Sequence, residues 1–171
     1  MRRLIRSSCI AILASLITSS YWPVASAAET RAQTPAGAPV PGGACSLITK
    51  EEVAAALAVA VTGPKEINRA NSPGPGSSVS SCSYQGSGLQ ALTLTVTRLS
   101  ASFAPTFREG CAKTAKDGLD GLGDLACWYN AEHQELHAFK GATFVNLQLR
   151  KGGDTTEVIK GVMKKALERL K

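Results

Sequence analysis

The sequence is short of the residues that mark nucleic-acid-binding proteins. Aromatic residues make up 5% of the chain, and Arg and Lys do not cluster around them. The formal charge of +6 includes Arg2, Arg3 and Arg6, and residues 1–27 contain no acid, so the remainder carries 6 − 3 = +3. So modest an excess favours neither nucleic-acid binding nor strong adsorption to membranes. We therefore expect no nucleic-acid partner.

Long apolar runs are also missing, and the longest near the N-terminus covers residues 9–17. A membrane span needs about 20 apolar residues, so this run is too short to anchor the chain. Three arginines precede it and Ala25-Ser26-Ala27 follows, an arrangement typical of a secretory signal peptide. Cys9 lies too early to be a lipidation site. We expect residues 1–27 to be removed, leaving a periplasmic or secreted chain without a transmembrane span.

Residues 28–44 have little to bury, because three prolines and three glycines lie among small residues. This composition predicts a flexible linker. Residues 45–171, 171 − 44 = 127 in number, are enough for a single domain with one core.

Sequence signatures of common catalytic and cofactor sites are absent. The chain has no G-x-S-x-G, no G-x-x-x-x-G-K, no G-x-G-x-x-G and no C-x-x-C. We expect no cofactor.

The two histidines, His133 and His137, lie four apart in A-E-H-Q-E-L-H-A (131–138), without the H-E-x-x-H order of zinc proteases. Such a pair can clip one metal ion on a helix, where the side chains are about 5–6 Å apart. On a strand the same spacing separates them by about 13 Å. The stretch precedes an alternating strand, so we predict a strand after a turn at 130–134. His133 and His137 remain the only metal candidates, and we expect no metal site.

Four cysteines follow the signal: Cys45, Cys82, Cys111 and Cys127. An even count in an exported chain indicates two disulfides, for which three pairings exist. We favour Cys45–Cys82 and Cys111–Cys127 because this sequential pairing joins neighbouring predicted elements. Closing loops of 37 and 16 residues would contribute about 3.8 and 3.1 kcal/mol on the loop-entropy model.

Hydrophobic periodicity predicts an α+β domain stapled by disulfides. Helices are expected at 48–58, where Thr49 and Glu52 form a capping box, at 102–116, and from a cap at Asp154 or Thr155 to Leu170. Strands are expected near 65–69, 82–84, 92–97, 125–130, 135–139 and 143–150, with loops at 71–81 and 117–124. These elements predict a single domain with a mainly antiparallel sheet of five or six strands and three helices.

Three motifs occur in a familiar order: C-S-L-I-T-K-E-E-V (45–53), C-S-Y (82–84) and D-G-L-G-D-L-A (120–126). They resemble a family of small exported bacterial domains of unknown function, common among actinobacterial lipoproteins. The resemblance implies an α+β fold and a disulfide between Cys45 and Cys82. It implies no catalytic residues. The chain departs from the lipoprotein members by lacking a lipidation cysteine, and Cys111 and Cys127 are not part of the family pattern.

These features predict a non-catalytic module of the cell envelope that binds an envelope or extracellular protein or a small ligand. Trp128 and Tyr129, on opposite faces of one strand, are the candidate contact residues. One alternative is a small metal-dependent or acid–base hydrolase that uses His133, His137, Glu132 and Glu135. A second alternative is a secreted inhibitor or immunity-type protein.

Overall fold

The computed structural model describes residues 41–114 and 119–171. The predicted signal peptide (1–27) and most of the predicted linker (28–40) lie outside these residues. The described elements, in chain order, are η1 (Ala44–Leu47), α1 (Lys50–Leu57), β1 (Thr62–Ala70), β2 (Ser78–Gln85), β3 (Ala91–Arg98), α2 (Ala104–Thr114), β4 (Leu125–Trp128), β5 (Glu135–Lys140), β6 (Thr143–Arg150) and α3 (Thr156–Arg169).

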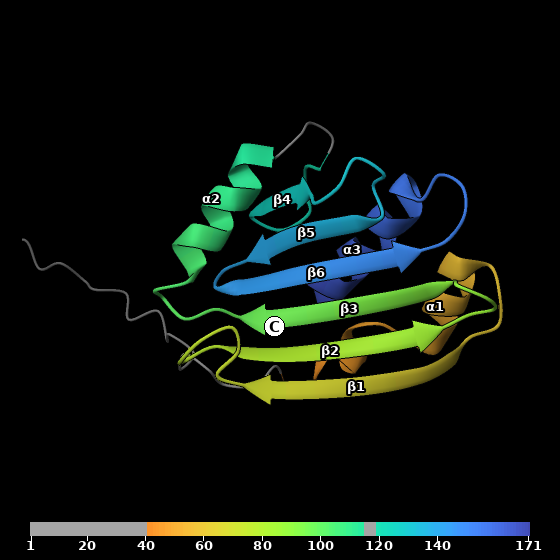
Figure 1. Ribbon diagram of the computed structural model, residues 1–171, viewed down its shortest axis with the longest axis horizontal. Coiled ribbons are helices and arrows are strands. Elements are labelled where there is room, and N and C mark those ends of the chain that lie inside the picture. The colour runs from red at the N-terminus through yellow and green to blue at the C-terminus, as the bar shows by residue number, and fades with distance from the viewer. Residues whose placement is uncertain (1–40, 115–118) are drawn as a thin grey trace, which may run out of the picture. The chain divides into compact units, whose positions relative to one another are not determined.

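The six strands form one antiparallel sheet in the order β1-β2-β3-β6-β5-β4 (Figure 1). Both α1 and α3 cover one face of this sheet, and α2 packs beside β4 near one edge. The predicted α+β class, with three helices and an antiparallel sheet, is confirmed for the described residues.

The main core lies between the sheet and the pair α1 and α3. Leucines at alternate positions of the two central strands, Leu94 on β3 and Leu147 on β6, are paired in register and have no exposed surface. From α3, Ile159 and Met163 meet them and are equally buried. The period of two in the strands and the apolar stripe of the helix therefore fix which face of the sheet is covered.

Charged side chains join the helices to each other and to the sheet. The predicted capping box of α1 is present, since Thr49 and Glu52 exchange backbone and side-chain hydrogen bonds. The guanidinium of Arg169 donates two hydrogen bonds to the Glu52 carboxylate, of 2.6 and 2.8 Å. At the same C-terminal end of α3, Lys140 Nζ donates to the carbonyls of Leu167 and Leu170, which satisfies carbonyls left free at the end of the helix.

Both disulfides follow the sequential pairing. Cys45–Cys82 joins η1 to β2 with a Cα–Cα distance of 5.0 Å, and Cys111–Cys127 joins α2 to β4 at 5.5 Å. Both Cα–Cα distances lie in the range usual for disulfides.

The predicted loop at 71–81 is too long, because its last residues belong to β2. Ser78–Gln85 pairs along its full length with β3, although four of its eight residues are serines. Register with a strongly apolar neighbour outweighs weak local strand propensity here. In the same way β1 extends over nine residues, all of them exposed. None of the described helices has the length and apolar content needed to cross a membrane.

Candidate functional site

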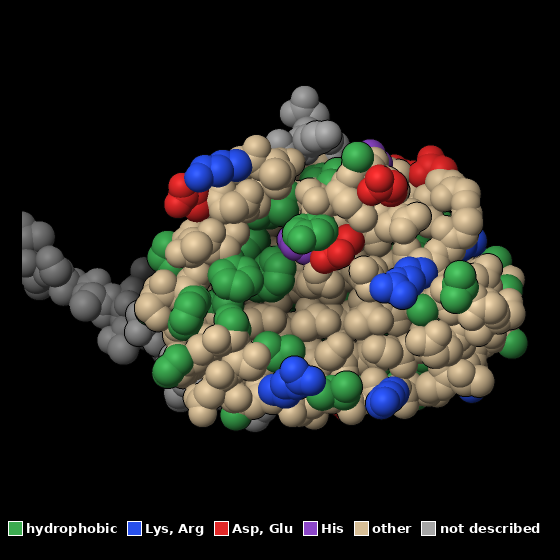
Figure 2. All heavy atoms as spheres, in the orientation of Figure 1, with side chains coloured by type: hydrophobic (Ala, Val, Ile, Leu, Met, Phe, Trp, Pro, Cys, Tyr) green, Lys and Arg blue, Asp and Glu red, His purple; other side chains and the backbone are tan. Residues whose placement is uncertain are grey.

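The face of the sheet opposite α1 and α3 is mostly polar. Hydroxyl groups pair across β2 and β3, with Ser81 and Thr95 at 3.1 Å and Ser83 and Thr93 at 3.3 Å. Figure 2 shows this face, where hydrophobic side chains gather only beside α2, next to a histidine and an acidic side chain. This gathering marks a second, smaller core under α2, formed by Leu99, Cys111, Cys127, Phe139 and Phe144.

A groove of about 530 Å³ lies between α2 and strands β4, β5 and β6. Its described lining residues are Thr106, Phe107, Gly110, Cys111, Thr114, Cys127, Tyr129, Glu135, His137, Phe144 and Asn146. The volume falls in the range typical of sites for small molecules.

Four aromatic rings in mutual contact line the groove. Tyr129 lies 5.1 Å from the His137 ring, His137 lies 5.0 Å from Phe144, and Phe144 lies 5.4 Å from Phe107, measured between ring centres. The last two pairs meet edge to face, an arrangement that aromatic rings favour. Tyr129 is 68% exposed and forms the outer end of the row.

A compact polar cluster lies at one side of these rings. Asn146 Nδ2 donates to Glu135 Oε1, and His137 Nε2 lies 3.0 Å from the same oxygen and 2.8 Å from Asn146 Nδ2. The Glu135 and His137 side chains are each 15% exposed. Because Oε1 takes the short contacts, Oε2 is left with one long hydrogen bond of 3.5 Å from Gln148. Glu135, which lines the groove, therefore keeps one carboxylate oxygen with spare capacity to accept a hydrogen bond.

The structure does not bring the two histidines together. His133 lies in the turn before β5, where its ring stacks on Trp128 at 4.5 Å and its Nδ1 contacts the Thr156 hydroxyl. Trp128 belongs to the main core, whereas His137 contacts Phe144 on the opposite face of the sheet. Glu132 is exposed in the turn. Only His137 and Glu135 of the four residues assigned to an acid–base site meet.

Among the described residues, no group of three or more His, Cys, Asp or Glu side chains is placed to hold a metal ion. Of the two candidate contact residues, Trp128 is 7% exposed in the main core, so Tyr129 is the one available at the surface.

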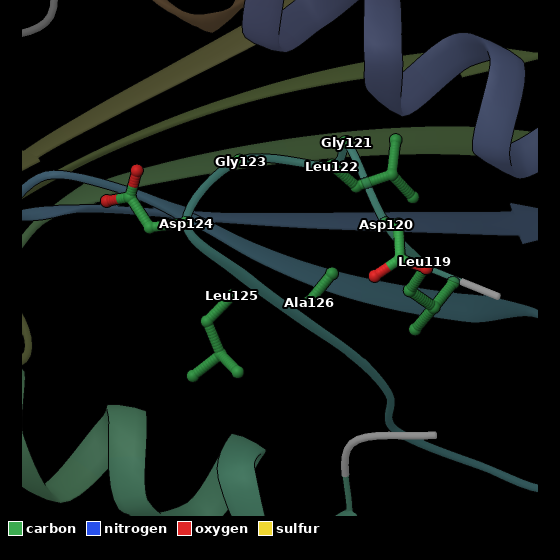
Figure 3. A pocket seen from close by; sticks show the side chains of 8 residues that line it. All are labelled: Leu119, Asp120, Gly121, Leu122, Gly123, Asp124, Leu125 and Ala126. Atoms are coloured by element: carbon green, nitrogen blue, oxygen red, sulfur yellow. The ribbon is translucent and has the colours of Figure 1, made fainter. Parts of the chain in front are cut away.

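A smaller hollow of about 230 Å³ is lined by residues 119–126 alone (Figure 3). Its two carboxylates, Asp120 and Asp124, lie at opposite ends of the loop. Asp124 is already engaged, because its Oδ2 accepts hydrogen bonds from the Gly141 amide and from Arg108. The D-G-L-G-D motif therefore anchors a turn onto the β5–β6 hairpin.

The groove residues that sequence reasoning missed include Phe107, Phe144 and Asn146. The alternation of residues 143–150 does place Phe144 and Asn146 on one face of β6, and that signal was available. Phe107 belongs to the apolar face of the helix predicted at 102–116, but nothing in the sequence indicates which strands this helix packs against.

No protein-family model, curated protein or solved structure matches this chain.

Proposed function

We propose that the protein is an exported, non-catalytic module of the cell envelope that binds a small molecule in the groove between α2 and β4–β6. The observation that carries the proposal is the groove itself, with its aromatic lining and a single convergent polar cluster. Mostly apolar walls with a few placed polar groups are the usual composition of a ligand site.

Three features support the absence of catalysis. Both cysteines of the groove are joined in a disulfide, so neither offers a thiolate. The Thr114 hydroxyl donates to backbone carbonyls of its own helix. Glu135 Oε1, His137 and Asn146 hold one another in place through short contacts, as the groups of a recognition site do.

Export and family membership belong to the same proposal. Two disulfides suit an oxidising compartment, which agrees with a periplasmic or secreted location. The motifs shared with the exported lipoprotein domains have structural roles here, in the Cys45–Cys82 bond, the Thr49 cap and the Asp124 anchor.

Two glycines allow a matched test of the groove. Gly110 lines it from α2, Gly161 lies on α3, and a Cβ added to either meets nothing within 4 Å. Gly110→Trp should therefore fill the groove without disturbing the fold, and Gly161→Trp should leave it open. The full chain, produced in an oxidising compartment, is titrated with the neutral fluorophore Nile red.

We expect saturable binding by the wild type and Gly161→Trp, and its loss in Gly110→Trp. Equal binding by all three proteins would contradict the proposal. A second outcome would also contradict it: none of the three proteins binds Nile red, and the wild type and Gly110→Trp capture the same envelope protein equally well.

A further inference from the structure

We propose that the ligand of the groove is a small organic cation, an ammonium group carried on an apolar or aromatic body. This inference rests on the proposed function and names the class of molecule that the groove selects. Its basis is the charge and the ring arrangement of the lining.

The groove has one sign of charge. Glu135 is the carboxylate among its described lining residues, and none of these residues is Lys or Arg. The cations of α2 are engaged elsewhere, because Arg108 donates to Gly141 O and to Asp124, and Lys113 pairs with Glu109 at 2.7 Å. An anionic ligand would thus meet a carboxylate with no Lys or Arg beside it among the described lining residues, whereas a cation would meet its complement.

The rings supply the second attraction. The Tyr129 ring lies against His137, whose Nε2 is 3.0 Å from the Glu135 carboxylate, so an aromatic ring and a carboxylate border the same end of the groove. An ammonium group is attracted to the face of a Tyr or Phe ring. Glu135 Oε2, with its single long bond, can accept the hydrogen of an amine.

The apolar part of the ligand has its own place. Phe107, Phe144 and the Cys111–Cys127 disulfide continue the groove away from the carboxylate. A molecule with a charged head at Glu135 and an apolar body along these residues fills both regions.

The test compares three probes that share a phenyl ring and differ in charge: benzylammonium, benzyl alcohol and benzoate. Each is titrated into the isotope-labelled full chain, and Kd is obtained from amide shifts in the groove. We expect benzylammonium to bind about tenfold more tightly than benzyl alcohol, and benzoate to bind least.

Glu135→Gln keeps the shape of the side chain and removes its charge. It should lower the affinity for benzylammonium about tenfold and leave that for benzyl alcohol unchanged. Glu157→Gln, which removes the same charge from an 82% exposed side chain on α3, should change neither. Tyr129→Leu should weaken benzylammonium more than benzyl alcohol, and Tyr129→Phe should not.

The outcomes separate this inference from the proposed function. Equal affinities for the cation and the alcohol, tighter binding of benzoate, or a cation preference that survives Glu135→Gln would overturn the inference while the groove remains a ligand site. No shifts in the groove with any probe would count against both.

Discussion

Gly123 lies where the loop before β4 touches the β5–β6 hairpin, with φ at +74°. A Cβ built there would overlap the carbonyl oxygen of Phe139, whose own partner is the amide of Asp124. Gly121, two residues earlier, has φ at +78° but open space around it. The two glycines therefore separate the cost of a left-handed backbone from the cost of a close approach.

We expect Gly121→Ala to lower the free energy of unfolding by about 1 kcal/mol, the usual cost of a side chain at positive φ. Gly123→Ala should lower it by more than about 2 kcal/mol, because the backbone must also shift. Chemical denaturation of both variants measures the difference. Equal losses would mean that Gly123 does not pack closely against the carbonyl oxygen of Phe139.

Glu52 is the acid whose ionisation is most tied to folding. Its hydrogen bonds with Arg169, opposed by partial burial and helped by the Thr49 amide, lower its pKa from 4.5 to about 2. A lowered pKa in the folded chain means that this stabilisation is present above pH 4.5 and is lost as the pH falls towards 2.

At neutral pH we expect Glu52→Gln to destabilise the domain by about 1–2 kcal/mol, a value reduced by the partial exposure of Arg169. The gap between wild type and variant should close between pH 4.5 and about 2. Unfolding curves across this range measure it, with the exposed neighbour Glu51→Gln as the control. A gap that persists at the acid end would rule out the ion pair as its cause.

At the scale of elements, α2 is held differently from the other helices. Only Cys111 of its described residues is buried, whereas α3 buries five apolar side chains. The Cys111–Cys127 bond is thus the covalent attachment of a helix whose other contacts, among them Phe107 with Phe144, are only partly buried.

Replacing both Cys111 and Cys127 with Ser should cost up to about 3 kcal/mol and release α2 from the sheet. Amide hydrogen exchange should become fast throughout α2 while β3 and β6 stay protected, and Nile red binding should be lost. The matched double variant at Cys45 and Cys82 removes the disulfide that closes the longer loop, and it should destabilise the domain more yet keep α2 protected. Unchanged exchange in α2 without its disulfide would contradict this.

The sequence predicts those elements whose hydrophobic period is strong, and these include α3, β3 and β6. It misplaces the start of β2, because four serines give a weak strand signal that pairing with β3 overrides. The groove was beyond reach because it depends on where α2 crosses the sheet. The spacing of His133 and His137, on a predicted strand, argued against a metal site formed by both. It could not predict that Asn146 would lie beside His137 and Glu135.

At the scale of the whole molecule, the proposed export and the two disulfides together predict the N-terminus and the mass of the mature chain. We expect the proposed signal peptide to be cleaved together with Cys9, so that the mature chain begins at Ala28 and has lost four hydrogens to its two disulfides. Intact-mass measurement before and after reduction shows both features, and thiol titration of the unreduced, denatured chain should find no free sulfhydryl. Two or more accessible sulfhydryls would exclude the two-disulfide domain.

The disulfide between α2 and β4 also implies an order for two steps, because it must form before the groove is complete. A newly made copy in a reducing cytosol would have α2 undocked and only one side of its binding surface in place. We expect such a copy not to bind the proposed ligand. Under the proposed export, binding therefore begins only after the sulfurs of Cys111 and Cys127 have joined, outside the cytosol.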